Sequence, residues 1–382
     1  MNIGIDAKRA YHNGTGLGHY SRTLISTLAE FYPEHEYYLF NPKRSLKFNL
    51  PILKNIHEVL PPFPSSLVAS AWRSSWVKSD LKKYKIDLYH GLSNEIPIGI
   101  QNTNIKSVVT IHDLIHERYP EQYNAIDVKI YNKKFRYACD NADKIIAISK
   151  QTKQDIIEYY KTPEEKIIVC YQSCNPIFST QISEDEKKRI KQLYDLPEKY
   201  FLYVGSIIER KNLLSICKAL VLLKEDLNIP LVVIGEGGKY KHVVKEFVSA
   251  NGLEQQVIFL SESKAAKFEV FTTAKDFPAI YQSALAMIYP SVFEGFGIPV
   301  LEALFSRLPV ITSNISSLPE AGGDAVYYVD ALNVEHITYA MKKIFYDEQL
   351  RETMKQKGIV HAQNFTQKKC AHAVMQVYKS LW

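Results

Sequence analysis

Short apolar runs recur along the whole chain, and most are followed by glycine, proline or polar residues. Runs of this kind are typical of buried strands, whereas longer stretches with apolar residues at helical spacing predict amphipathic helices between them. The alternation predicts an α/β protein. The predicted strands are residues 2–7, 36–40, 86–90, 107–111, 144–149, 166–169, 200–204, 231–234, 257–260, 285–289 and 309–313, and the predicted helices include 19–31, 151–160, 184–193 and 367–381.

The apolar run 285–289 leads into a turn that contains two glycines and then into a predicted helix. Pro299 falls in the first turn of that helix. Backbone N–H groups in the first turn have no acceptor within the helix, so the N–H that proline lacks costs no hydrogen bond there. Free backbone N–H groups at a helix N-terminus favour a phosphate or a polarised oxygen. The predicted donors are Gly295, Phe296, Gly297, Ile298 and Val300.

Two glutamates flank this turn. Glu294 lies just before it, and Glu302 lies eight residues later on the predicted helix. Eight residues are a little over two helical turns, so the Glu302 side chain would lean back toward the N-terminus and share a cleft with Glu294. The residues alone leave an alternative open, because a glutamate in a first helical turn is often only a partner of the helix dipole.

The segment 294–303 reads Glu-Gly-Phe-Gly-Ile-Pro-Val-Leu-Glu-Ala. It resembles the signature of retaining glycosyltransferases of family 4, which have the GT-B fold, and further motifs of that family occur in order along nearly the whole chain. The resemblance implies two Rossmann-like domains facing across a cleft. We expect an N-terminal acceptor domain over 1–180, a C-terminal donor domain over 181–365, and a last helix, 366–382, that packs back on the first domain.

A glycine-rich stretch, 13–18, follows the first predicted strand. The resemblance implies a loop in which Gly16 and Gly18 line the cleft near donor and acceptor. As a dinucleotide fingerprint the stretch is weak, because its glycine spacing departs from G-x-G-x-x-G and no acidic residue follows at the ribose-binding spacing. A nicotinamide-dependent dehydrogenase is therefore disfavoured.

The predicted strand 107–111 ends in His112 and Asp113. Ligands of open α/β sheets bind beyond the carboxyl ends of strands, which is where His112 falls. A lone histidine is more often structural, but Thr-Ile-His-Asp-Leu resembles the strand-end motif of mannosyltransferase-like members of family 4. That resemblance implies that His112 reaches the donor sugar or the reacting centre, and that Asp113 orients the ring or positions the acceptor.

The strand 200–204 runs into Gly205, and Arg210 and Lys211 follow shortly after. Adjacent cations are usually only solvated, yet arginine binds phosphates bidentately and lysine adds a compact charge. The position resembles the diphosphate-binding pair of family 4. The resemblance further implies that Glu302 binds ribose hydroxyls and that Glu294 holds hydroxyls of the transferred sugar. Since the cations offset the charge of the leaving diphosphate, no metal and no other cofactor is expected.

Two regions leave alternatives open. The segment 261–276 is longer than its family counterpart, lacks a glycine there and carries an extra β-like run, 268–271; it falls where the nucleobase would bind, so the base stays undecided. The stretch 60–84 combines Trp72 and Trp76 with basic residues. It is either a helix on a membrane interface or an ordinary surface helix whose tryptophans pack inward.

Composition narrows the partners. The chain has 47 Lys and Arg against 41 Asp and Glu, a net charge of +6, which suits anionic ligands or a bilayer surface and does not call for nucleic acid. No apolar run is long enough to span a membrane, and the N-terminus enters a strand without a signal peptide. The five scattered cysteines lack zinc-ligand spacing and suit a reducing compartment. We expect a cytoplasmic protein, with peripheral contact at the inner face of the membrane as an option.

The resemblance therefore implies transfer of a hexose, with retention of configuration, from a sugar nucleotide to a hydroxyl of a glycan or lipid-linked saccharide. Residues 110–114 together with Glu-Arg-Lys-Asn at 209–212 most resemble mannosyltransferases and favour GDP-mannose. A UDP-hexose donor stays open. So do two other classes, a sugar-nucleotide epimerase of the same fold and a non-catalytic binding protein.

Overall fold

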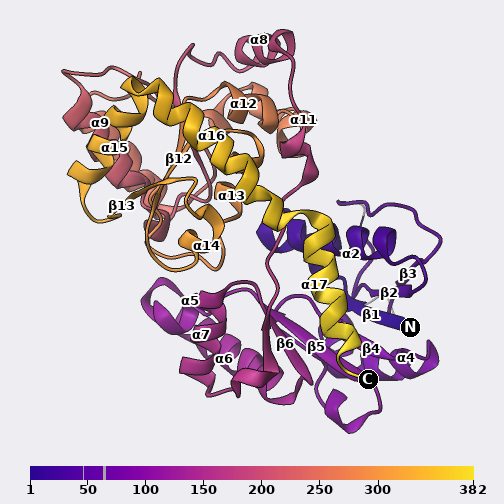
Figure 1. Ribbon diagram of the computed structural model, residues 1–382. Coiled ribbons are helices and arrows are strands. Elements are labelled where there is room, and N and C mark those ends of the chain that lie inside the picture. Colours follow the sequence, from indigo (N-terminus) through magenta and orange to yellow (C-terminus); the bar gives the residue numbers. More distant parts are fainter. Residues whose placement is uncertain (46, 63–65) are drawn as a thin grey trace. The chain divides into compact units, whose positions relative to one another are not determined.

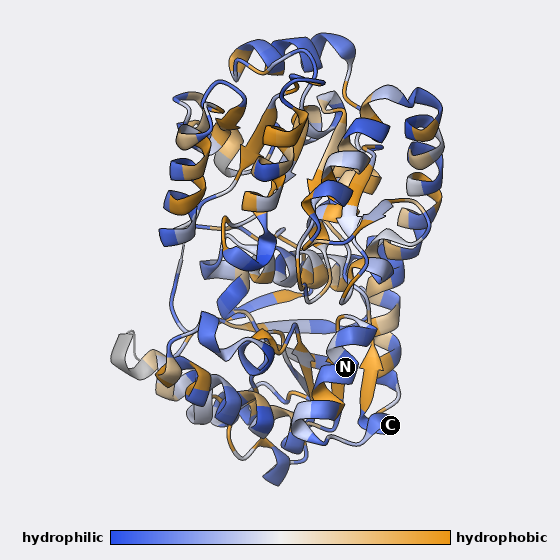
Figure 2. Ribbon diagram, turned by 90° about the vertical axis from the view of Figure 1, so that its left-hand side faces the viewer, coloured by the Kyte–Doolittle hydropathy of each residue, from blue (hydrophilic) through white to orange (hydrophobic). Residues whose placement is uncertain are grey.

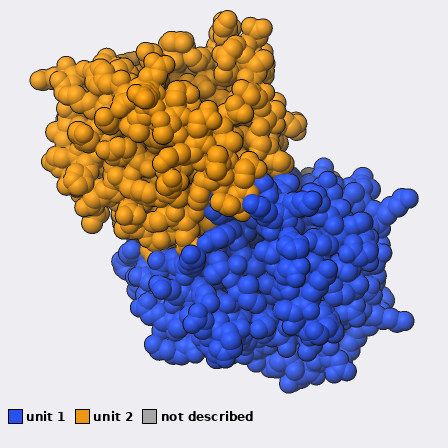
Figure 3. Space-filling model, in the orientation of Figure 1, with its two compact units in different colours: residues 1–174, 365–382 blue, residues 175–364 orange. Residues whose placement is uncertain are grey.

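The computed structural model describes residues 1–45, 47–62 and 66–382, which form two compact units (Figures 1 and 3). Unit 1 comprises Met1–Cys174 and Phe365–Trp382, and unit 2 comprises Asn175–Asn364. Each unit contains one parallel sheet with helices packed against it. The prediction of a GT-B protein with two Rossmann-like domains is confirmed.

In the described part of unit 1 the sheet has seven parallel strands in the order β3-β2-β1-β4-β5-β6-β7, which follows the doubly wound order of dinucleotide-binding folds. The strands are β1 (Asn2–Asp6), β2 (Glu36–Phe40), β3 (Ile56–Val59), β4 (Leu88–Gly91), β5 (Lys106–Ile111), β6 (Lys144–Ala147) and β7 (Ile167–Val169). The helices are α1 (Lys8–His12), α2 (Gly16–Phe31), α3 (Ser66–Ala71), α4 (Val77–Lys83), α5 (Ile115–Arg118), α6 (Ala125–Asn141), α7 (Lys150–Tyr160) and α17 (Gln367–Lys379).

Unit 2 repeats this order with six strands, β10-β9-β8-β11-β12-β13, over its described residues. The strands are β8 (Phe201–Val204), β9 (Leu231–Ile234), β10 (Val257–Phe259), β11 (Ala286–Tyr289), β12 (Val310–Ser313) and β13 (Tyr327–Val329). The helices are α8 (Glu184–Leu193), α9 (Leu213–Leu223), α10 (Lys239–Ala250), α11 (Glu269–Thr272), α12 (Phe277–Ser283), α13 (Ile298–Phe305), α14 (Leu318–Gly322), α15 (Val334–Tyr346) and α16 (Glu348–Ala362).

Helices cover both faces of the sheets, which is why the strands are mostly apolar and buried (Figure 2). In β5 the neighbours Val108 and Val109 are both completely buried, yet they join different apolar clusters because successive strand side chains point to opposite faces. Every residue of β11 is buried as well. Short apolar runs in the sequence therefore predicted most of the strands correctly.

The strand order reverses between β1 and β4 in unit 1 and between β8 and β11 in unit 2. The connections that leave two such strands turn to opposite sides of the sheet, so a crevice opens at their carboxyl ends. In unit 2 the residues that follow β8 are 205–211, and those that follow β11 are 290–294. The fold thereby brings together two segments that are far apart in sequence.

The last helix, α17, belongs to unit 1 and packs against α2. Its Tyr378 hydroxyl lies 2.6 Å from Nδ1 of His90 on β4, and Nε2 of His90 lies 2.8 Å from the hydroxyl of Thr110 on β5. Burial lowers the pKa of His90 to about 3, so the ring is neutral at physiological pH. A polar chain of contacts thus ties the end of the polypeptide to the middle of the first sheet.

Several sequence predictions need correction. The run 268–271 is not a strand: residues 269–271 lie within α11, where local hydrogen bonds such as Thr273 N–H to the Glu269 carbonyl at 2.9 Å satisfy the backbone. Two short edge strands, β3 and β13, were not predicted; their alternation is too brief to stand out from a loop.

The stretch 60–84 includes residues 63–65, which lie outside the described residues. The remainder forms α3, a π-helical turn over Trp72–Trp76, and α4. Inward packing is confirmed for Trp72, which is 2% exposed, whereas Trp76 is 57% exposed. Among the described residues no helix is long and apolar enough to cross a bilayer.

Candidate active site

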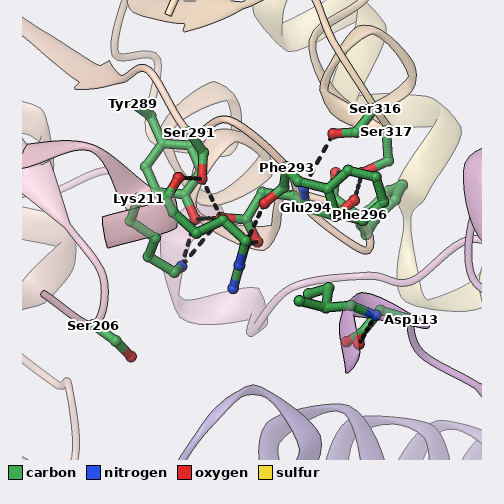
Figure 4. A network of polar contacts seen from close by, with 12 residues as sticks. Asp113, Ser206, Lys211, Tyr289, Ser291, Phe293, Glu294, Phe296, Ser316 and Ser317 are labelled. Carbon is green, nitrogen blue, oxygen red and sulfur yellow. Dashed lines mark hydrogen bonds and ion pairs between the residues drawn. The ribbon is translucent and has the colours of Figure 1, made fainter. Parts of the chain in front are cut away.

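Glu294 follows β11 and lies at the centre of a buried polar network in unit 2 (Figure 4). Its Oε1 accepts hydrogen bonds from the hydroxyls of Tyr289 and Ser291, both at 2.7 Å. Nζ of Lys211 lies 3.4 Å from the same oxygen, and Nη1 of Arg210 lies 3.2 Å from Oε2. We call these five residues the Glu294 cluster. The sequence predicted three of them, Arg210, Lys211 and Glu294.

The Glu294 cluster keeps a surplus of positive charge. Burial alone would raise the pKa of Glu294, but the charges of Lys211 and Arg210 and the hydrogen bonds from Ser291 and Tyr289 lower it to about 2. The carboxylate is therefore ionised at neutral pH. One negative charge against two positive charges leaves a net charge of +1, which suits an anionic ligand.

Backbone contacts hold the two cations beside Glu294. Arg210 and Lys211 lie on a 3₁₀ turn, Glu209–Lys211, between β8 and α9. The Arg210 carbonyl accepts from the N–H of Val292 at 2.8 Å, and its guanidinium donates to the Phe293 carbonyl. The turn after β8 is thereby bonded directly to the segment after β11, at the point where the strand order reverses.

Gly205 leaves room for Lys211. The backbone of Gly205 has φ +152°, and a Cβ there would lie 3.2 Å from both Cδ and Nζ of Lys211. The Lys211 side chain extends over the ring of Tyr289, 5.0 Å from its centroid, and donates to the Tyr289 hydroxyl at 2.6 Å. A larger residue at position 205 would push this cation away from Glu294.

Helix α13 begins as predicted, with Gly297 in a left-handed conformation (φ +113°) and Pro299 in the first turn. One predicted donor is wrong, because the N–H of Val300 already donates to the Gly297 carbonyl at 3.0 Å. Gly295 and Phe296 also have partners of their own. For the N–H groups of Gly297 and Ile298 we find no hydrogen-bond acceptor among the described residues.

Glu302 lies on α13 and differs from Glu294 in its surroundings. It accepts a hydrogen bond from the Tyr281 hydroxyl of α12 at 2.9 Å. Burial raises the pKa of Glu302 to about 7, and neither this hydrogen bond nor the charge of Lys211 offsets the burial. The two glutamates of the signature therefore have different protonation behaviour near neutral pH.

In unit 1, His112 lies at the end of β5 with its ring held on both sides. Nε2 donates to the Leu92 carbonyl at 2.8 Å, and the Gln172 amide nitrogen lies 3.2 Å from Nδ1. Burial lowers the pKa of His112 to about 4, so the ring is neutral at pH 7. Its Nδ1 could contact a sugar only if Gln172 moved away, while Asp113 accepts from the N–H of Ile115 at the start of α5.

Gly16 and Gly18 lie in the first turn of α2, so the prediction of a loop that contains them is wrong. The helix starts early because the Thr15 carbonyl accepts from the N–H groups of Gly18 and His19. A Cβ at Gly18 would lie 1.8 Å from the carbonyl oxygen of Asn13, so no larger residue fits at this position. Close packing is therefore sufficient to explain the glycine. No atom would lie within 4 Å of a Cβ at Gly16, so the space beside it is open.

Tyr289, Ser291, Tyr281 and Gln172 were not predicted as site residues. Tyr289 ends an apolar strand and looked like a core residue, and no local motif marks the other three. Ser291 had a detectable signal, since it is a polar residue directly after a strand at the reversal of strand order. Among the described residues no group of three or more His, Cys, Asp or Glu could hold a metal ion.

Comparison with known proteins assigns the family. The family model for glycosyl transferases group 1 matches residues 184–361, and that for glycosyltransferase family 4 matches residues 14–176. The chain is 27% identical over 393 residues to the O-antigen chain mannosyltransferase B of Escherichia coli, with 96% of each chain covered.

Solved structures agree on the fold. A glycosyltransferase from Rickettsia africae matches with a TM-score of 0.74 at 18% identity, over 99% of this chain and 97% of that one. Anabaena HepE in complex with UDP and glucose matches with a TM-score of 0.73 at 14% identity, over 100% of both chains. The chain belongs to the group 1, family 4 glycosyltransferases and is an enzyme of the hexosyltransferase type.

Proposed function

We propose that this enzyme transfers mannose, with retention of configuration, from GDP-mannose to a hydroxyl of a glycan or lipid-linked saccharide. The observation that carries the proposal is the Glu294 cluster, a buried set of groups with a net positive charge at the strand reversal of unit 2. The relatives named O-antigen mannosyltransferases support mannose as the sugar.

Arg210 and Lys211 would bind the diphosphate of the donor and offset the negative charge that develops as it leaves. The N–H groups of Gly297 and Ile298 would add donors at the start of α13. These groups take the place that a divalent metal has in other transferases, so we expect activity without added metal. We assign no protein group as the base that deprotonates the acceptor.

The two glutamates would hold different parts of the donor. Glu294 would accept from hydroxyls of the sugar, since it is ionised and lies beside the cations that bind the diphosphate. Glu302, one helical segment further on, would accept from ribose hydroxyls. We assign donor binding to unit 2 and acceptor binding to unit 1, where Asp113 would help to position the acceptor. The enzyme would act in the cytoplasm, in contact with the inner membrane surface.

A UDP-hexose is the alternative donor, because the Anabaena protein of the same fold holds UDP-glucose in its crystal structure. Thermal stabilisation and slow hydrolysis separate the two, with GDP, GDP-mannose, UDP and UDP-glucose as probes. We expect GDP-mannose to stabilise the protein most and to release mannose in the absence of acceptor. Preference for UDP-glucose would show that the donor is a UDP-hexose. Release of an epimerised sugar would indicate an epimerase. If no probe is bound or hydrolysed, the proposal is wrong.

A further inference from the structure

Gln172 lies three residues after β7 in unit 1, and its side chain is buried. His112 follows β5 directly, and Leu92 follows β4 directly. The carboxyl ends of parallel strands meet at one edge of the sheet, which is where ligands of open α/β sheets bind. These three residues contact one another at this edge, on the side of unit 1 that can receive a substrate.

The proton on the His112 ring has a fixed position. A backbone carbonyl can only accept a hydrogen bond, so the contact of 2.8 Å between Nε2 and the Leu92 carbonyl places the N–H on Nε2. Burial lowers the pKa of His112 to about 4, so at neutral pH the ring has no second proton. Its Nδ1 is therefore an acceptor, and the Gln172 amide nitrogen, 3.2 Å away, donates to it.

The same contact fixes which way the Gln172 amide points. The nitrogen and the oxygen of an amide have nearly the same shape, and their hydrogen-bond partners decide which is which. Since Nδ1 of His112 requires a donor, the amide nitrogen faces the ring and Oε1 faces away from it. For Oε1 we find no donor among the described residues, and this oxygen is not sealed from solvent. A buried side chain therefore offers one acceptor that the protein leaves unused.

The His112 ring, in contrast, is held from several sides. The Tyr20 ring packs edge-on against it, with the ring centroids 4.8 Å apart. The His112 backbone N–H donates to Oδ1 of Asn94 at 2.9 Å, and its carbonyl accepts from the Thr152 hydroxyl at 3.2 Å. Both ring nitrogens also have protein partners. The ring is thus a rigid support whose hydrogen-bonding atoms are already in use.

We infer that Gln172 contacts a hydroxyl of the saccharide in unit 1 and that His112 is its positioning residue. Oε1 accepts from a pyranose hydroxyl, either of the transferred hexose or of the acceptor, and the second N–H of the amide can donate to a neighbouring hydroxyl. The family resemblance implied this contact for His112, but the hydrogen bonds of the ring favour Gln172. The inference rests on the proposed function and adds a sugar-binding residue that no sequence motif marked.

Nitrogen-15 NMR of the full chain tests the pair without any ligand. We expect a neutral His112 ring that is protonated on Nε2. The Nδ1 signal should shift in Gln172→Met, because the donor to Nδ1 is lost. A ring protonated on Nδ1, or an Nδ1 signal that is the same in Gln172→Met, would refute the inference. This result does not depend on which sugar nucleotide is the donor.

Binding measurements test the contact with the sugar. Calorimetry compares GDP-mannose with GDP, and UDP-glucose with UDP, in the wild type and in Gln172→Met. If the hydroxyl belongs to the transferred hexose, the variant should bind the sugar nucleotide about tenfold more weakly and the bare nucleotide unchanged, since one hydrogen bond is lost. If it belongs to the acceptor, transfer to methyl α-mannoside should need about tenfold more of this sugar. No change in either measurement would overturn the inference.

Gln256→Met is the matched structural control. Gln256 is also buried, and its amide donates to the Ile229 carbonyl at 2.9 Å in unit 2. It precedes β10 directly and therefore lies at the opposite edge of its sheet from the carboxyl ends. Both variants remove a buried amide and should lower stability, but only Gln172→Met should weaken sugar binding. Equal losses of sugar affinity would indicate a general effect of destabilisation, and the inference would be wrong.

Two variants of His112 separate positioning from direct contact. In His112→Asn the side-chain oxygen can take the place of Nδ1 and accept from Gln172, so sugar affinity should be largely retained. In His112→Leu the amide loses its partner, and the affinity should fall as in Gln172→Met. The double variant should be no weaker than either single variant, because both residues act through one contact. Additive losses, or a full loss in His112→Asn, would show that the imidazole itself contacts the sugar.

The proposed function and this inference fail in different ways. A wild type that binds none of the four nucleotides would refute the proposed function, whereas the NMR comparison would still decide whether Gln172 donates to His112. Normal donor hydrolysis together with unchanged sugar binding in Gln172→Met would refute the inference alone.

Discussion

The two units share their strand order, yet their buried charged clusters are arranged in opposite ways. In the Glu294 cluster of unit 2, one carboxylate lies between two cations and accepts from two hydroxyls. In unit 1, the Arg73 guanidinium lies between the carboxylates of Asp6 and Glu95, and Lys134 lies beside Glu95, so the set is neutral in sum. We call these four residues the Arg73 cluster. Asp6 ends β1 and Glu294 follows β11, so both clusters lie at a reversal of strand order.

The difference shows that one fold can hold either a charged or a neutral cluster at its reversal of strand order. The surplus positive charge in unit 2 is retained in a buried site, where it would interact strongly with a phosphate. In unit 1 two cations balance two carboxylates, so the Arg73 cluster has no surplus charge to attract a phosphate. We therefore expect the two clusters to respond differently to the removal of one charge.

The largest effect is expected in the Arg73 cluster. Arg73→Met would leave Asp6 and Glu95 without the cation that lowers the pKa of Asp6 against the effect of burial. Breaking a buried ion pair on one side costs about 3–5 kcal/mol of stability. Urea unfolding monitored by circular dichroism would measure this loss, with Arg44→Met on the exposed surface as the control. A loss as small as that of the control would mean that the cluster is not structural.

A large kinetic effect is expected in the Glu294 cluster. Lys211→Gln would remove the surplus charge while Arg210 still pairs with Glu294, so the protein should fold. Loss of one group that stabilises the leaving diphosphate should lower the transfer rate by about 10²–10³. Single-turnover rates compared with Lys218→Gln, an exposed lysine on α9, provide the measurement. Equal turnover in the two variants would contradict the role of the surplus charge.

Glu302 sharpens the comparison, because its partner is a neutral hydroxyl rather than a cation. Its pKa is raised from 4.5 to about 7 on folding, so the folded state holds a proton that the unfolded state lacks between these pH values. The stability from protonated Glu302 is complete below pH 4.5 and is lost as pH rises through 7.

At pH 8, Glu302→Gln should therefore be more stable than the wild type, by roughly 3 kcal/mol from the size of the shift, and at pH 4.5 the two should be similar. Glu294→Gln should do the opposite. The pKa of Glu294 is lowered to about 2, so its stability is present above 4.5 and disappears as pH falls through 2. Thermal unfolding at several pH values distinguishes the two; parallel pH profiles would show that the surroundings of the glutamates are equivalent.

The smallest effect concerns nucleotide affinity. Glu302→Gln should weaken GDP binding about tenfold at pH 8, where the native carboxylate is ionised and would accept from ribose hydroxyls. Glu294→Gln should leave GDP affinity nearly unchanged but lower turnover, because a sugar hydroxyl held slightly wrong misplaces the reacting carbon. Calorimetry with GDP beside single-turnover rates tests this separation. Equal and small changes in both variants would contradict the roles assigned to Glu302 in ribose binding and to Glu294 in sugar binding.

Much of the site could be predicted because it is encoded locally. Glu294, Glu302 and Pro299 lie within one short segment, and helix α13 begins where proline and glycine indicate. Arg210 and Lys211 were predicted from their position after a strand and from the family resemblance. Tyr289 was missed because a tyrosine at the end of an apolar strand looks the same whether its hydroxyl meets solvent or a carboxylate. The early start of α2 at Gly16 was missed because glycine usually marks a loop.

The sequence by itself determined the α/β class, the positions of most strands and the start of α13. Those features follow from neighbouring residues, since a strand buried on both faces must be apolar and a helix N-terminus accepts proline. Only the tertiary structure decided that Glu294 is fully ionised at neutral pH while Glu302, with a pKa of about 7, is only partly ionised there. Burial raises the pKa of both side chains, and only Glu294 lies beside two cations and two hydroxyls that reverse this effect. The two cations come from another segment of the chain, which the fold brings beside Glu294.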